Sequence, residues 1–146
     1  MDEDDTDEGS GQVPLLVVDA ANVVGSVPDG WWRDRRRAAE RLRDSLTGIA
    51  DGGLVSPAGG PAWAHSGPLE VVLVVEGAAR GVAPVPGVRV EAASGSGDDR
   101  IVDLVENALT DRTRRRCLVV TADRGLRARV TALGADVVGP RAVRPA

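Results

Sequence analysis

The sequence contains no lysine, phenylalanine or tyrosine, and it has one cysteine and one histidine. All 18 basic residues are arginines, which excludes every mechanism that needs a lysine amine, including a Walker phosphate-binding loop. The single cysteine, Cys117, excludes an internal disulfide, and with His65 as the only histidine no Cys/His zinc site can be assembled. Catalysis by a pair of histidines is excluded for the same reason. Any metal ion must therefore be bound by oxygen ligands.

Long apolar runs are also missing. No segment approaches the roughly 18 apolar residues of a membrane-spanning helix, and no charged start leads into an apolar core. We therefore expect neither a membrane span nor a signal peptide, and we expect a cytoplasmic protein. The 146 residues suffice for one domain with a buried core. We divide the chain into an acidic tail at 1–11, a folded domain at 12–140 and a C-terminal tail at 141–146.

The net charge of -4 comes from one short stretch. Of the 22 acids, six lie in residues 2–8, so the 18 arginines outnumber the other 16. Such an acidic run is typical of a disordered, solvated tail. The alternative is a tail that imitates nucleic acid and screens a basic site. The rest of the chain is slightly basic.

Apolar β-forming runs alternate with segments of helical periodicity. The predicted strands are 12–18, 69–75, 88–92, 117–120 and 135–138. Apolar spacings of three and four predict helices over 32–50, 98–111 and 124–133, the last capped by Gly134. Glycine and proline predict loops at 23–31 and 52–68, the second of them flexible. This alternation predicts a three-layer α/β/α sandwich around a mainly parallel sheet of about five strands.

Acidic residues follow the predicted strands where the chain leaves the core. Asp19 follows the first strand, Glu76 the second and Asp123 the fourth, while Asp98 and Asp99 open the helix after the third. Because the carboxyl ends of parallel strands face one edge of a sheet, we expect these side chains to meet there. So many carboxylates repel one another unless a cation lies among them. Mg²⁺ or Mn²⁺ is the kind of ion that such oxygen ligands suit.

A divalent ion bound by carboxylates lowers the pKa of a bound water and neutralises charge on a phosphate, so the predicted reaction is hydrolysis of a phosphodiester. Asn22 adds a neutral oxygen, or a donor to substrate, near this site. For each acid taken singly, the alternative is a helix cap or a turn. A dinucleotide-binding fold is excluded because Asp19-Ala20-Ala21-Asn22 stands where that fold needs glycines. Phosphoaspartate receivers and haloacid-dehalogenase-like phosphatases also place acids here, but typically use a lysine.

Arginines near the acids are candidates for binding the phosphates of a nucleic acid. Arg33 and Arg37 fall on one face of the first predicted helix, and Arg124 follows the last of the acids. The alternatives are a solvated helix face for the first two and an ion pair for Arg124. Trp31 and Trp32 could stack on a base, or they could anchor the loop that contains them.

Four stretches of the sequence together resemble a known family. They are Val17-Val18-Asp19-Ala20-Ala21-Asn22-Val23-Val24, Val74-Val75-Glu76-Gly77, Ser96-Gly97-Asp98-Asp99-Arg100-Ile101 and Val119-Val120-Thr121-Ala122-Asp123-Arg124-Gly125-Leu126. They look like the four ordered blocks of NYN domains, in particular the YacP-like branch of the PIN-like nuclease superfamily, over roughly residues 13 to 140. The resemblance implies a PIN-like fold with a sheet of order 3-2-1-4-5. It also implies a metal-dependent ribonuclease, which we expect to be an endoribonuclease.

The blocks assign roles to individual residues. The metal-site aspartates of the family match Asp19, Asp98 and Asp123, and the asparagine after the first strand matches Asn22. Asp99 lies at a position that is acidic in the family, often Glu, and we include it among the metal ligands. The resemblance thus implies an Mg²⁺ or Mn²⁺ site in which Asn22 positions the substrate.

Two features depart from the family pattern. Glu76 stands where the second block usually ends in Asp, one methylene shorter, and we count it among the catalytic residues. The extended segment at 52–68 is not part of the pattern. The expected partner is RNA, and a homodimer is compatible with the sequence. Alternatives from other classes are a non-catalytic RNA-binding or ribosome-associated module with the same fold, and an interaction domain whose acids only bind an ion.

Overall fold

The structure is a computed structural model that describes residues 13–26, 30–55, 59–110 and 115–143; the predicted acidic tail at 1–11 lies outside them. Its sheet contains β2 (Leu15–Asp19), β3 (Glu70–Val75), β4 (Val88–Ala92), β5 (Cys117–Val120) and β6 (Asp136–Val138). The strands lie in the order β4-β3-β2-β5-β6, and every neighbouring pair is parallel. Counted along the chain this is the order 3-2-1-4-5, so the predicted topology is confirmed.

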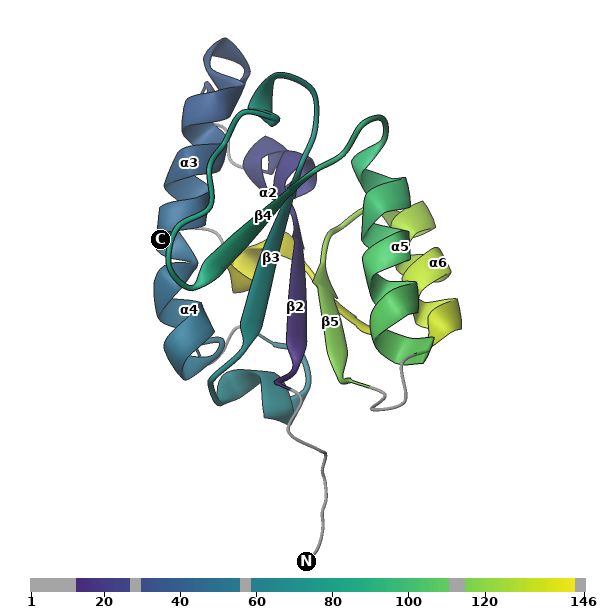
Figure 1. The fold of residues 1–146 in the computed structure, drawn as a ribbon. Coiled ribbons are helices and arrows are strands. Elements are labelled where there is room, and N and C mark those ends of the chain that lie inside the picture. Colours follow the sequence, from purple (N-terminus) through teal and green to yellow (C-terminus); the bar gives the residue numbers. More distant parts are fainter. Residues whose placement is uncertain (1–12, 27–29, 56–58, 111–114, 144–146) are drawn as a thin grey trace, which may run out of the picture.

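Helices cover both faces of this sheet (Figure 1). The helices on one face are α2 (Ala20–Gly25), α3 (Arg35–Ser45) and α4 (Thr47–Gly52); those on the other are α5 (Gly97–Thr110) and α6 (Arg124–Leu133). The predicted three-layer α/β/α sandwich is therefore confirmed. Within the described residues, no helix is long and apolar enough to cross a membrane.

The central strand β2 is apolar at successive positions because both of its faces are buried. Leu16 and Val18 pack in the cluster under α2, α3 and α4, whereas Leu15 and Val17 pack in the cluster under α5 and α6. Neighbouring strands β3 and β5 alternate in the same way. Burial of this apolar surface on two sides supplies the main driving force for folding.

The helical prediction needs two corrections. The sequence pattern predicts a loop over 23–31, but α2 begins directly after β2 because the Asp19 carboxylate caps it, accepting the Asn22 N–H. The helix predicted over 32–50 is two helices, α3 and α4, with Leu46 between them. Asp34 starts α3 by accepting the Arg37 N–H at 3.0 Å. Periodicity located the apolar face but not these boundaries, which depend on side-chain caps.

The segment predicted as a flexible loop at 52–68 is anchored where the structure describes it. It contains a 3-10 helix, η2 (Ala62–His65), in which Ala64 is fully buried. The ring nitrogens of His65 lie 3.1 Å and 2.7 Å from the carbonyl oxygens of Leu54 and Gly59. In this part of the segment, glycine and proline interrupt the helical pattern while the backbone stays packed against its neighbours.

The chain remains packed beyond residue 140. A second 3-10 helix, η4 (Pro140–Ala142), follows β6, and both Ala142 and Val143 are buried in the cluster under α2, α3 and α4. The helix α6 ends as predicted at Gly134, whose φ of +107° lies in the left-handed region that glycine adopts without strain.

Candidate active site at the carboxyl edge of the sheet

The topology creates a crevice between β2 and β5. From β2 the chain continues to β3 on one side of the sheet, and from β5 it continues to β6 on the other side, so the direction of winding reverses between these two neighbours. In open α/β sheets, ligands bind outside the carboxyl ends of the strands at such a point. Asp19 ends β2 here, and Thr121 and Asp123 follow β5.

Asp19 is a buried carboxylate, with 5% of its surface exposed. Its Oδ2 accepts a hydrogen bond from Thr121 Oγ1 at 2.9 Å, and its Oδ1 accepts from the Asn22 N–H at 3.4 Å. Burial raises the pKa of Asp19 to about 6; the two hydrogen bonds oppose this shift, and the charges of Asp98 and Glu76 add to it. The surroundings of Asp19 therefore disfavour the charged form of its carboxyl group.

Thr121 holds this arrangement together, although the sequence pattern alone assigns it no role. It is fully buried, donates to Asp19 and accepts the Asp123 N–H on the same oxygen at 3.1 Å. Its carbonyl oxygen accepts from Arg127 Nε at 2.8 Å. The signal available in the sequence was a threonine between an apolar run and an acid. A hydroxyl at such a position is expected to be buried, and buried polar groups need hydrogen-bond partners.

Asn22 and Asp123 fix the two sides of the crevice. Asn22 Oδ1 accepts the Ala122 N–H at 2.8 Å, which joins α2 to the loop after β5. Asp123 Oδ1 accepts the Leu126 N–H at 2.9 Å and caps α6. The helix-cap alternative is therefore correct for Asp123, as it is for Asp19, yet both caps lie at the crevice. For these acids a structural role and a place in the site coincide.

Glu76 joins the end of β3 to the start of α5. Its Oε1 accepts the Gly97 N–H at 2.7 Å, and a Cβ atom at position 97 would collide with that oxygen. The contact brings the first turn of α5 to the site. There, burial raises the pKa of Asp98, the charges of Asp123 and Glu76 raise it further, and the charge of Arg129 opposes them. The structure thus places these acids within electrostatic reach of one another.

The remaining predicted residues lie around this group. Asp99 is exposed and forms an ion pair with Arg129, Nη2 to Oδ1, at 3.1 Å. Arg124 is exposed at the first position of α6, next to Asp123. Of the predicted arginines, this one is adjacent in sequence to a site acid.

Arg33 and Arg37 are exposed near the start of α3. The guanidinium carbon of Arg33 lies 5.9 Å from the centroid of the Trp32 ring, and Trp32 is 57% exposed. The side chain of Trp31 lies outside what the structure describes. Trp32 is an exposed ring beside an arginine. This favours the interpretation that it stacks on a base over the interpretation that it is a buried anchor of its loop.

The acids suit a divalent ion in their chemistry but form no closed cage. In the described part of the chain, no three His, Cys, Asp or Glu side chains are grouped so that they could share one metal ion. Mg²⁺ usually keeps several waters and is bound by one or two carboxylates together with substrate phosphates. The raised pKa values of Asp19 and Asp98 mark a place where a cation is favoured. The donors therefore fit a hydrated Mg²⁺ or Mn²⁺ ion.

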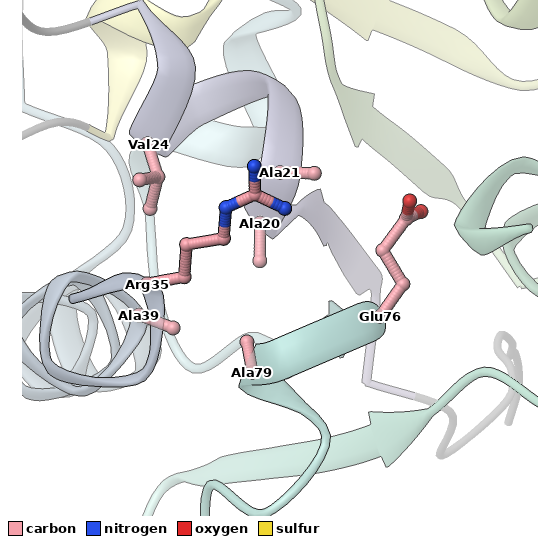
Figure 2. A pocket seen from close by; sticks show the side chains of 7 residues that line it. All are labelled: Ala20, Ala21, Val24, Arg35, Ala39, Glu76 and Ala79. Atoms are coloured by element: carbon pink, nitrogen blue, oxygen red, sulfur yellow. The ribbon is translucent and has the colours of Figure 1, made fainter. Parts of the chain in front are cut away.

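A pocket of about 130 Å³ adjoins this edge on the side of α2 and α3 (Figure 2). Its lining residues are Ala20, Ala21, Val24, Arg35, Ala39, Glu76 and Ala79. Ala20 directly follows Asp19, so the pocket opens beside the acids. This pocket does not stand out in the sequence, because small residues from three separate segments form its walls.

No family model and no curated protein sequence matches the chain. Among solved structures, the chain is similar to the crystal structure of a single-substitution mutant of Rae1 (YacP) from Bacillus subtilis, with a TM-score of 0.64. The sequence identity is 17%, and the match covers 90% of this chain and 72% of that chain. This similarity shows a YacP-like α/β fold, as the resemblance of the four sequence blocks implied.

Proposed function

We propose that the chain is an endoribonuclease that hydrolyses RNA phosphodiesters with the help of an Mg²⁺ or Mn²⁺ ion. The observation that carries the proposal is the buried Asp19 at the winding reversal, whose charge is disfavoured by burial and by Asp98 and Glu76. Acids kept together against their mutual repulsion are typical of functional sites. The similarity of the fold to Rae1 (YacP), with the four NYN-like sequence blocks, supports the choice of RNA as substrate.

One or two carboxylates from among Asp19, Asp98 and Asp123, with Asp99 as a further candidate, would hold the hydrated ion, which would supply a water of lowered pKa and neutralise charge on the phosphate. The protein keeps these ligands in place. Thr121 fixes the orientation of Asp19, and the cap on α6 fixes Asp123.

The neutral and basic side chains would bind the substrate. The oxygen of the Asn22 amide is used by the Ala122 N–H, so its NH₂ group is the part that would donate to a substrate oxygen. Arg33, Arg37 and Arg124 are exposed and would contact RNA phosphates on either side of the acids. In this proposal neither lysine nor histidine serves as a general base, because the chain lacks lysine and the ring nitrogens of its one histidine, His65, lie within hydrogen-bond distance of the carbonyl oxygens of Leu54 and Gly59.

The proposal is tested by incubating the protein with a circular and a linear single-stranded RNA in Mg²⁺, in Mn²⁺ or in EDTA. We expect both RNAs to be cut with either ion and neither in EDTA. Asp19→Asn should abolish cleavage, whereas Asp136→Asn, which removes an exposed acid at the other end of the sheet, should not. Cleavage that persists in EDTA or in Asp19→Asn would contradict the proposal, and a circle that survives would exclude endonucleolytic cutting.

A second candidate is a non-catalytic RNA-binding or ribosome-associated module that keeps the same fold. The observation in its favour is that no described set of three ligands could share a metal ion. RNA binding without cleavage in either ion, unaffected by Asp19→Asn, would select this candidate.

A further inference from the structure

The pocket beside the acids differs from them in character. Five of its seven lining residues are alanine or valine, and its charges are confined to Arg35 and Glu76. A phosphate would lose water against the apolar walls and would face the like charge of Glu76. A flat group with apolar faces and a polar edge suits these walls better. Nucleobases of single-stranded RNA have this character, and proteins commonly bind them splayed out in such places.

The pocket is large enough to hold part of one base. A cavity of about 150 Å³ lined by apolar side chains is enough to hold benzene. With about 130 Å³, this pocket admits part of one ring system, and its lining includes two charged groups, Arg35 and Glu76. Figure 2 shows the Arg35 side chain extending from α3 towards α2, with Glu76 at the end of β3 on the far side of Ala20.

The two charged groups select among the bases. An ionised carboxylate only accepts hydrogen bonds, and guanine alone has two adjacent donors, N1–H and N2–H₂, on its Watson–Crick edge. Adenine, cytosine and uracil each present a single donor group on that edge, next to one or two acceptors. Guanine also carries the acceptors O6 and N7, which suit a guanidinium with its five N–H donors. A pocket whose lining includes both a carboxylate and a guanidinium therefore matches guanine best.

We propose that this pocket is a guanine-binding site that holds a base of the RNA next to the phosphate to be cut. Glu76 accepts from N1–H and N2–H₂, and Arg35 donates to O6 or N7. The Gly97 N–H uses one of the roughly four acceptor positions of the Glu76 carboxylate and fixes its direction, so the others remain for the base. The inference rests on the proposed function, because Ala20 and Glu76 connect the pocket to the acids that would cut the RNA.

The first test uses oligouridylates that contain one guanosine, incubated with Mn²⁺, with the cleavage position mapped. We expect cutting within one or two nucleotides of the guanosine, and about a tenfold loss of this preference when inosine, which lacks the N2 amino group, replaces it. Ala21→Leu, at an exposed position of the lining, should remove the preference by filling the pocket. Ala128→Leu, at an exposed position of α6 on the other face, should keep it.

The second test measures binding without cleavage, with guanosine and inosine 5′-monophosphate titrated in EDTA and followed by NMR. Both probes carry the same phosphate, so we expect guanosine to bind about tenfold tighter through the base alone. Arg35→Gln should weaken the binding, and Arg36→Gln on the same helix should not. Melting curves of each variant confirm that it folds.

The two tests separate the possible failures. RNA cleavage without a guanine preference, together with equal binding of the two monophosphates, would overturn the guanine site and leave the proposed function standing. Selective guanosine binding that Ala21→Leu removes, in a protein that cuts no RNA, would keep the site and overturn the proposed function. A preference that persists in Ala21→Leu while the variant remains folded would also overturn the site.

Discussion

Two groups of acids in this molecule differ in their neighbours. At the carboxyl edge, the like charges of Asp98 and Glu76 act on Asp19, and those of Asp123 and Glu76 act on Asp98. The second group, Glu70 of β3 and Glu91 of β4, pairs with Arg89 of β4, Arg100 of α5 and Arg115, which precedes β5. We call these five residues the edge-strand network. The sequence has 18 arginines that could pair with these acids. Three of them, Arg89, Arg100 and Arg115, pair with the acids of the edge-strand network. At the carboxyl edge Arg129 pairs with the exposed Asp99, and its charge only partly opposes the rise in the pKa of Asp98.

The pKa values reflect this difference. In the edge-strand network, burial raises the pKa of Glu70, but hydrogen bonds from Arg115 and Arg89 outweigh burial and lower it. Hydrogen bonds from Arg89 and Arg100 likewise lower the pKa of Glu91. At the carboxyl edge the pKa of Asp19 is raised instead. Acids that are paired with arginines thus stabilise this fold. Acids whose pKa is raised by burial and by neighbouring like charges are the candidates for the active site.

The largest expected effect is on activity, when an acid of the carboxyl edge is replaced. Asp19→Asn removes a proposed ion ligand and should lower RNA cleavage in Mn²⁺ at least about 100-fold, because an ion at the phosphate contributes several kcal/mol to the transition state. Glu70→Gln in the edge-strand network should leave the rate within about twofold under the same conditions. Similar losses in both variants would show that the two groups do not differ in function.

The next effect is on the pH dependence of stability. The pKa of Asp19 is about 6 in the folded chain, against the ordinary value of 3.8 that applies to the unfolded chain, so the folded state binds more protons between these limits. The free energy of unfolding should therefore fall by roughly 3 kcal/mol from this group as pH rises from well below 3.8 to well above 6, with about 2 kcal/mol of this between pH 4 and pH 6. Urea unfolding in EDTA measures it, and Asp19→Asn should lack the fall. Parallel pH curves for the two proteins would contradict the assignment.

A smaller effect is expected at Thr121, which links the two sides of the crevice. Thr121→Val leaves Asp19 Oδ2 and the Asp123 N–H without their hydrogen-bond partner and should lower the free energy of unfolding by about 1–3 kcal/mol. Thr121→Ser keeps the hydroxyl and should lose less. The matched control is Thr131→Val, at an exposed position of α6. Equal losses in the serine and valine variants would show that the methyl group contributes as much as the hydroxyl.

The edge-strand network allows the opposite pH test. Glu70→Gln should lower the free energy of unfolding at pH 7 by about 1 kcal/mol, because Glu70 is partly exposed and the pair is screened by solvent. Since the folded pKa of Glu70 is lowered, its contribution is present above the ordinary value of 4.5 and lost as pH falls below it. The difference between variant and parent, measured by urea unfolding, should therefore shrink as pH falls below 4.5. A difference that grows at low pH would contradict this.

The smallest effect is expected at Asp99. It follows Asp98 of the carboxyl edge in sequence but is paired with an arginine, as the acids of the edge-strand network are. Its ion pair with Arg129 leaves the Asp99 side chain 73% exposed, so Asp99→Asn should change the free energy of unfolding by less than about 0.5 kcal/mol. Cleavage in Mn²⁺ should fall less than in Asp19→Asn, because the arginine already neutralises this carboxylate. A loss as large as that of Asp19→Asn would place Asp99 among the principal ion ligands.

Much of the fold followed from local pattern. The continuous apolar runs at Leu15–Val18 and Cys117–Val120 identified strands buried on both faces, and the parallel sheet then required their ends to share one edge. The short helix α2 was missed because its start depends on one capping contact, from Asp19 to Asn22, and not on periodicity. Caps couple particular side chains to particular N–H groups, and such pairings are weakly encoded in composition.

By itself, the sequence determined the order of the elements, the place of each acid at the end of a strand and the exclusion of lysine and histidine-pair chemistry, because these depend on residue type and spacing along the chain. Only the tertiary structure decided which acids received arginines, that Thr121 bridges Asp19 and Asp123, and that Arg35 and Glu76 border one pocket. Those facts depend on distances between segments far apart in sequence. Hydrogen bonds and charge interactions act over such distances in space, and spacing along the chain does not specify them.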